Sequence, residues 1–173
     1  MEIFVAICLC KRMLCVIIMP MKSDKNTCCL IGHNKLYDDE SQIRQWILEC
    51  VLKAVEGGYI HFICGGSVGF DMLAAEVIVE LKKSGHKILL ELALPFKNEF
   101  KPLRERLLFS LIETNADMVT YVNDNYSKNC YTERNKYMVD NSALVVVYNR
   151  ECLGGVFNTV EYAKMIKKTI YAL

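Results

Sequence analysis

The sequence predicts an α/β domain of Rossmann type, with a doubly wound, mainly parallel sheet that helices cover on both faces. From residue 27 to the end of the chain, short apolar runs alternate with longer stretches of helical periodicity. This alternation favours parallel strands joined by right-handed crossovers. The short runs are apolar throughout rather than at every second residue, as expected of strands that are buried on both faces.

The predicted elements follow one another without a linker. The first strand, 27–31, ends at Gly32-His33-Asn34, and a helix that begins with the acids at 38–40 ends at Gly57-Gly58. The remaining elements are a strand at 59–64, a helix at 70–84, a strand at 87–94, a helix at 99–113, a strand at 117–122, a helix at 128–140, a strand at 143–148, a helix at 154–168 and a candidate edge strand at 170–173. Residues 21–173 are therefore expected to form one domain.

Length, charge and cysteine usage narrow the function classes. The 173 residues carry a formal net charge of +1 without a basic run, so nucleic-acid binding is not the expected function. A chain of this length needs no disulfide to fold. Its nine cysteines form no C-x-x-C pair and no zinc-binding spacing, which predicts core thiols, a cytoplasmic location and no metal site.

Residues 1–20 form an apolar extension that Lys11 and Arg12 interrupt. Neither half is long enough to span a bilayer, and charges in the middle of the segment do not fit a signal peptide. We interpret Met21 as the natural start of the protein and expect no membrane attachment. A tail that packs on the domain or on a partner is the alternative interpretation.

Two glycine turns are the main candidates for ligand binding, because ligands of such sheets bind beyond the carboxyl ends of the strands. Both the 65–69 turn and the Gly154-Gly155 turn follow an apolar strand and open a helix, where backbone N–H groups suit an anion. A tight turn without a ligand is the alternative for each. The candidate ligand-binding residues are Gly32, His33, Gly65, Gly66, Ser67, Gly69, Asp71, Pro95, Tyr131, Arg134, Asn135, Gly154, Gly155, Asn158 and Thr159.

The predicted helix at 128–140 has a polar side. Tyr131, Arg134 and Asn135 share one face at helical spacing. An arginine in this position could bind a phosphate or carboxylate with two parallel hydrogen bonds. Alternatively, Arg134 forms an ion pair with a nearby acid such as Glu133 or Glu161.

Five segments, in order along the chain, resemble the SLOG superfamily and most closely its YpsA-like branch. They are 27–33, 65–76, 94–96, 131–140 and 154–155. The resemblance implies a bacterial or phage Rossmann-like domain that binds a nucleotide or nucleotide-derived ligand, such as ADP-ribose, as a sensor or sequestering module. It implies no further cofactor and is compatible with a homodimer.

Two alternatives come from the wider superfamily. Its cytokinin-activating phosphoribohydrolases carry the signature P-G-G-x-G-T-x-x-E, of which Gly154, Gly155 and Glu161 match the first glycines and the glutamate. This resemblance implies an N-glycosidic hydrolase with Glu161 and Arg134 as catalytic candidates, although residues 153, 157 and 158 depart from the signature. The related DNA-processing proteins imply instead a protein- or DNA-interaction module without a small ligand.

Overall fold

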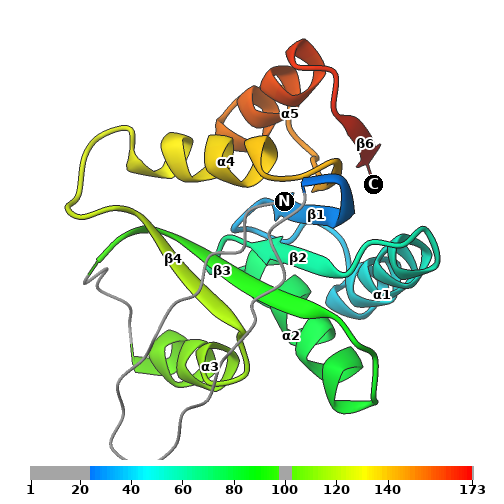
Figure 1. The fold of residues 1–173 in the computed structure, drawn as a ribbon. Helices are drawn as coiled ribbons and strands as arrows, with labels where there is room; N and C mark the ends of the chain where they lie inside the picture. Colours follow the sequence, from blue (N-terminus) through cyan, green and yellow to red (C-terminus); the bar gives the residue numbers. More distant parts are fainter. Residues whose placement is uncertain (1–23, 98–102, 173) are drawn as a thin grey trace, which may run out of the picture.

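The computed structural model describes residues 24–97 and 103–172; the predicted extension at 1–20 lies outside these ranges. A single 3₁₀ turn precedes five α-helices and six β-strands within the described residues (Figure 1). Their bounds are β1 Thr27–Gly32, α1 Glu40–Glu56, β2 His61–Cys64, α2 Phe70–Lys83, β3 Leu89–Phe96, α3 Leu103–Glu113, β4 Met118–Asn123, α4 Cys130–Asp140, β5 Leu144–Tyr148, α5 Gly155–Met165 and β6 Thr169–Ala172.

The six strands form one sheet in the order β4-β3-β2-β1-β5-β6, and all five neighbouring pairs are parallel. The chain moves outward from β1 to β4, then returns to place β5 on the other side of β1. The strand order therefore reverses between β1 and β5, where Cys29 pairs with Val145. This confirms the predicted doubly wound Rossmann-like class, whose ligand crevice lies at such a reversal.

Helices cover both faces of the sheet, and side chains alternate between two cores. Leu30 and Cys28 point to the larger core beneath α1, α2 and α3, whereas Cys29 and Ile31 point to a smaller core beneath α4 and α5 (Figure 1). Burial on both faces explains why the strands are continuously apolar. Burial also raises the pKa of the Cys29 thiol to about 12, so this cysteine is an unreactive core residue, as predicted.

Several element boundaries differ by a few residues from the sequence-based prediction, and three of these differences have a clear structural reason. The third strand does not end before Pro95 but continues to Phe96, which pairs with Asn123 of β4. Helix α5 ends at Met165 because the chain turns at Lys167, which adopts a φ of +58°. Strand β2 starts two residues late because the N–H of Tyr59 still donates to Ala54 at the end of α1.

A buried carboxylate fastens α4 to the sheet. Glu91, fully buried in the apolar strand β3, accepts hydrogen bonds from Tyr137 of α4 at 2.7 Å and from Thr120 of β4 at 2.8 Å. Nε2 of His61 lies 3.0 Å from its second carboxylate oxygen. Because a buried charge is tolerated only when it is paired and hydrogen-bonded, this network fixes the position of α4 over β3, and with it the polar side of α4.

Candidate functional site

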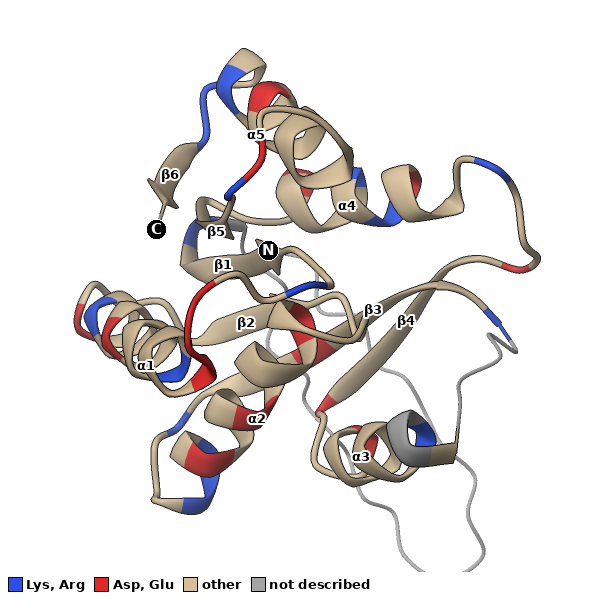
Figure 2. Cartoon of the chain, turned by 180° about the vertical axis from the view of Figure 1, so that it is seen from behind, with Lys and Arg blue, Asp and Glu red and all other residues tan. Residues whose placement is uncertain are grey.

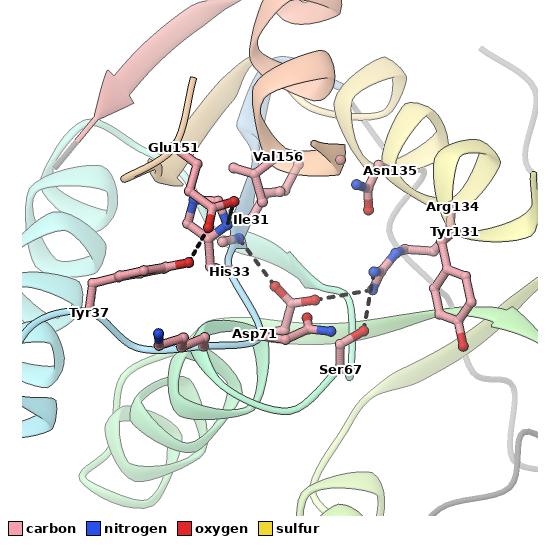
Figure 3. A pocket seen from close by; sticks show the side chains of 14 residues that line it. Ile31, His33, Tyr37, Ser67, Asp71, Tyr131, Arg134, Asn135, Glu151 and Val156 are labelled. Carbon is pink, nitrogen blue, oxygen red and sulfur yellow. Dashed lines mark hydrogen bonds and ion pairs between the residues drawn. The ribbon is translucent and has the colours of Figure 1, made fainter. Parts of the chain in front are cut away.

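A cavity of about 370 Å³ lies at the carboxyl ends of β1 and β5, where the strand order reverses. Its walls come from the β1–α1 loop, the turn before α2, the first turns of α4 and the start of α5 (Figure 3). The lining residues are Ile31, Gly32, His33, Asn34, Lys35, Tyr37, Ser67, Asp71, Tyr131, Arg134, Asn135, Glu151, Gly155 and Val156. Its place and size are those of a small-molecule site in a doubly wound fold.

The first glycine turn is occupied by an arginine of the protein itself. The guanidinium of Arg134, only 5% exposed, donates to the carbonyl oxygen of Gly65, to Asp71 Oδ2 at 3.1 Å and to Ser67 Oγ at 3.2 Å. Figure 3 shows Arg134 reaching from α4 to Asp71 and Ser67 across the floor of the cavity. Arg134 thus holds α4 against the turn, and its acidic partner is Asp71 rather than Glu133 or Glu161.

The glycines of this turn are required by contacts within the protein. A Cβ at Gly65 would collide with the side chains of Arg134 and Asp71, and one at Gly69, where φ is +81°, would collide with the backbone of Asn34. A Cβ at Gly66 would lie 2.7 Å from Leu94. These glycines permit close approach of backbone to other parts of the chain. None of the three lines the cavity.

Asp71 and Arg134 form a buried ion pair whose two charges compensate each other. Burial raises the pKa of Asp71, and the charge of Arg134 together with hydrogen bonds from the N–H groups of Gly32 and Ser67 opposes that shift. Asp71 and Arg134 are both about 95% buried. Since the two charges neutralise each other, they contribute little net charge to the cavity above them.

The second glycine turn faces open space. Gly154, with a φ of +94°, is the N-cap of α5, and as a glycine it has no side chain to cap this helix. A Cβ at Gly155 would meet no atom within 4 Å, and Gly155 and Val156 both line the cavity. The first backbone N–H groups of a helix have no intrahelical partner, so this end of the cavity presents donors and a positive dipole end.

The side chain of Asn135 is oriented by a hydrogen bond to Thr159 of α5. Its Nδ2 donates to Thr159 Oγ1 at 3.0 Å, and that hydroxyl donates to the carbonyl oxygen of Gly155 at 2.7 Å. The amide nitrogen is thereby engaged by Thr159, and the amide oxygen remains as an acceptor beside the cavity that Asn135 lines. Thr159 supports this arrangement without lining the cavity.

The opposite wall contains residues that the sequence did not single out. The hydroxyl of Tyr37, in the β1–α1 loop, donates to Glu151 Oε1 in the β5–α5 loop. Hydrogen bonds from the backbone N–H groups of Tyr37 and Asp38 to the Tyr148 hydroxyl, at 2.8 and 3.2 Å, join the β1–α1 loop to the end of β5. Arg150 adds an ion pair with Asp38 at 2.8 Å. An isolated tyrosine and glutamate in loops 114 residues apart give no sequence signal.

The structure brings together eight of the predicted site residues and leaves the others outside the cavity lining. The eight are Gly32, His33, Ser67, Asp71, Tyr131, Arg134, Asn135 and Gly155. The others are Gly65, Gly66, Gly69, Pro95, Gly154, Asn158, Thr159 and Glu161. Pro95 is buried within β3, where its carbonyl oxygen accepts a hydrogen bond from Asn123.

Glu161, the catalytic candidate, lies on the exposed side of α5. Its carboxylate forms an ion pair with Lys164 at 2.8 Å, and half of its side chain is exposed. The carboxylates that do line the cavity are Asp71, which Arg134 neutralises, and Glu151. Among the described residues, no group of three or more His, Cys, Asp or Glu side chains is arranged to hold a metal ion.

Lysines, arginines and acids are interspersed over the helices and loops of the described chain (Figure 2). This agrees with the formal net charge of +1. In the described part of the chain, no helix is both long and apolar enough to cross a bilayer.

The architecture and the position of the cavity define a Rossmann-like α/β domain, and solved structures share this fold. DNA processing protein A from Streptococcus pneumoniae matches 84% of this chain with a TM-score of 0.63 and 12% identity. The same protein from Helicobacter pylori, described by its single-stranded DNA binding mode, matches 84% with a TM-score of 0.61 and 15% identity. A structural-genomics target named TM1055 matches 84% with a TM-score of 0.56 and 16% identity.

Family membership comes from sequence. The YpsA family model, described as the YspA SLOG family, matches residues 33–172, so the chain belongs to this family, which confirms the resemblance drawn above. A curated relative, UPF0398 protein lwe1908 from Listeria welshimeri serovar 6b, is 26% identical over 136 residues, covering 76% of this chain and 75% of the relative. By contrast, the chain spans 49% of the Streptococcus protein, 64% of the Helicobacter protein and 72% of TM1055.

Proposed function

We propose that this protein binds a nucleotide or nucleotide-derived ligand, of the ADP-ribose type, in the cavity between β1 and β5, and acts as a cytoplasmic sensor or sequestering module. The observation that carries the proposal is the open α5 N-terminus, where Gly155 and Val156 line a cavity of about 370 Å³. This combination offers a phosphate group unpaired backbone donors at the switch point of the sheet.

The other lining groups suit the remainder of such a ligand. Ser67 Oγ accepts from Arg134 at 3.2 Å, so its hydroxyl hydrogen remains to donate to the ligand. The amide oxygen of Asn135 provides an acceptor, and Tyr131, 42% exposed, provides an aromatic surface. Donors, acceptors and a ring around one cavity match a molecule that combines phosphate, sugar and base.

The test replaces Gly155, because its backbone is unstrained and its Cβ has open space. A glutamate side chain in the first turn of a helix stabilises the helix. Its negative charge would nevertheless repel a phosphate that binds to the N–H groups of the same turn. We expect Gly155→Glu to fold normally and to lose at least tenfold in affinity for ADP-ribose, measured by isothermal titration calorimetry and by the ligand-induced rise in melting temperature. Gly155→Gln is the matched control, since it adds equal bulk without charge.

The two variants separate repulsion of a phosphate from simple obstruction of the cavity. Equal losses of affinity in Gly155→Glu and Gly155→Gln would show that the size of the new side chain, and not its charge, weakens binding. That result would contradict a phosphate at the α5 N-terminus. If ADP-ribose, NAD and a panel of nucleoside mono- and diphosphates all leave the melting temperature of the wild-type protein unchanged, the proposed function is wrong.

Single-stranded DNA is the second candidate ligand, favoured by aromatic rings that pack beside the cavity-lining Tyr131. The ring of Phe96 packs edge-to-face on Tyr126 and Tyr131, with centroid distances of 5.5 and 6.4 Å. Tyr126 is 67% exposed. Exposed aromatic rings stack nucleobases in proteins that bind single strands, and the Helicobacter pylori structural neighbour is described by such binding. Salt-dependent anisotropy of a labelled oligo-dT, weakened in Tyr126→Ala, would support this candidate.

A further inference from the structure

Glu151 is a carboxylate at the cavity wall that the ligand-binding scheme above does not use. It lies in the loop between β5 and α5, its side chain is 47% exposed, and it lines the cavity. Figure 3 shows it beside His33 and the hydroxyl of Tyr37, on the opposite side of the cavity from Tyr131. Any ligand that fills the cavity to this wall meets Glu151.

Two side chains of the β1–α1 loop lie beside this carboxylate. The hydroxyl of Tyr37 donates to Glu151 Oε1, and this bond raises the pKa of Tyr37, since a phenolate beside a carboxylate is disfavoured. Nδ1 of His33 lies 3.9 Å from Oε2. The Tyr37 hydrogen bond holds Oε1, and the His33 ring lies beside Oε2 at a distance too long for a direct hydrogen bond.

The tautomer of His33 is set by the backbone. The N–H of Arg150 donates to His33 Nε2 at 3.0 Å, so in the neutral ring Nε2 accepts and Nδ1 carries the proton. Asn149 Oδ1 lies 3.2 Å from the same nitrogen, but a backbone N–H can only donate and therefore decides the assignment. The Nδ1–H side of the ring faces Glu151.

The charge of Glu151 is not neutralised by a strong base. Among the described residues, neither a lysine nor an arginine nitrogen lies within 4 Å of its carboxylate. Arg150 pairs with Asp38 and Arg134 pairs with Asp71. The cation on this wall, Lys35, places its ammonium 5.0 Å from the centre of the Tyr37 ring. A ligand phosphate against Glu151 would meet a fixed negative charge, whereas a hydroxyl would meet an acceptor.

We propose that Glu151, Tyr37 and His33 form a subsite for the vicinal hydroxyls of a ribose, which selects ligands with a free diol and rejects those with a phosphate on it. The subsite rests on the proposed nucleotide-binding function. Glu151 accepts from one or both sugar hydroxyls, and hydrogen bonds to a carboxylate are among the stronger ones in proteins. A Cβ at Gly154, the N-cap of α5, would lie 3.9 Å from Glu151 Oε2, so this diol subsite borders the helix end at which the ligand phosphate is proposed to bind.

The experiment measures binding of three small probes by calorimetry: AMP, its 2′,3′-dideoxy form and adenosine 3′,5′-bisphosphate. AMP has one sugar and one phosphate, so any difference in affinity between AMP and its dideoxy form comes from the diol of that one ribose. We expect the wild-type protein to bind AMP about tenfold more tightly than either other probe. In Glu151→Gln the preference over the dideoxy probe falls to a fewfold, and the bisphosphate binds more tightly than to the wild type.

Glu133→Gln is the matched control, because it removes one carboxylate from the exposed side of α4, outside the cavity lining, and should retain the wild-type preferences. Tyr37→Phe, which deletes the donor that orients Glu151, should reduce the preference for AMP partially. A wild-type protein that binds AMP and dideoxy-AMP equally would overturn the ribose subsite while leaving the proposed function intact. Failure of all three probes to bind, together with ADP-ribose, NAD and the panel of nucleoside mono- and diphosphates, would overturn both.

Discussion

The two glycine turns of this domain have similar sequences around them but opposite surroundings. Both follow an apolar strand and open a helix, and the sequence predicts that both contact a ligand. At the first, Arg134 and Asp71 fill the space in front of Gly65. At the second, the space in front of Gly155 is empty and belongs to the cavity. A glycine-rich turn at a strand end therefore indicates close approach of some group, and only the fold determines whether that group is protein or ligand.

This difference assigns separate tasks to the two turns. The first turn joins α2 to α4 through a buried ion pair and acts as a brace for the floor of the cavity. The second turn leaves helix donors uncapped at the wall of the cavity. Substitutions at the first turn should mainly change folding stability, whereas substitutions at the second should mainly change binding.

The largest expected effect is at Arg134. Replacing it by methionine leaves the Asp71 carboxylate buried without its partner, which costs about 3–5 kcal/mol of unfolding free energy. Urea denaturation of Arg134→Met measures the loss, and the double variant Arg134→Met/Asp71→Leu should recover much of it because both charges are then absent. A variant of unchanged stability that has lost only ligand binding would show that Arg134 is a ligand residue instead of a brace.

Gly65→Ala should have the next largest effect. The new methyl group would collide with the side chains of Arg134 and Asp71, and such overpacking costs about 1–3 kcal/mol. The midpoint of urea denaturation should fall while the slope stays constant. The same substitution at Gly155, where the methyl group meets no atom within 4 Å, is the control, and equal losses at both positions would contradict the comparison.

A smaller effect concerns the pH dependence of stability. Because burial raises the pKa of Asp71 in the folded state, the native protein retains a proton there that the unfolded chain releases above about pH 3.9. The contribution of Asp71 to stability is thus greatest below that pH and falls as pH rises through the folded-state pKa. In Asp71→Asn this fall should disappear from the pH profile of unfolding free energy. A profile that parallels the wild type across this range would exclude the raised pKa.

Gly155→Ala should show the smallest effect and the opposite sign. Alanine reduces the conformational freedom of the unfolded chain, and Gly155 has no positive φ, so a gain of about 0.5 kcal/mol in unfolding free energy is expected. Thermal unfolding monitored by circular dichroism can detect the corresponding rise in melting temperature. Gly154→Ala, at the neighbouring position, is a useful comparison. The φ of Gly154 is +94°, so alanine should destabilise the protein there although the surrounding space is similarly open.

Much of the fold was accessible from the sequence because each signal is local. The apolar run at 144–148 and the helical periodicity of 43–54 are set by a few neighbouring residues, and the alternation of such segments fixes a parallel sheet. Boundaries were less accurate where a non-local contact decided them. Pro95 was expected to end its strand, but pairing of Phe96 with Asn123 in β4 continues it.

Only part of the candidate site can be predicted from the sequence, again because some of its contacts are non-local. Tyr131, Arg134 and Asn135 could be grouped because helical spacing places them on one face. Tyr37 and Glu151 could not, since they meet only when the β1–α1 and β5–α5 loops come together above neighbouring parallel strands. The resemblance to a hydrolase signature predicts a catalytic Glu161, yet in the structure it lies on the exposed side of α5 beside Lys164.

The sequence by itself determined the order and kind of the elements, the family, and the two strand ends at which glycines allow close approach. The tertiary structure alone decided what approaches them. Arg134 crosses from α4 to fill the first turn because its charge, once buried, requires Asp71. The second turn stays open because the N-cap of α5 is a glycine, which has no side chain to cap the helix, and pairing of β5 beside β1 places that helix end on the same cavity as Tyr37 and His33.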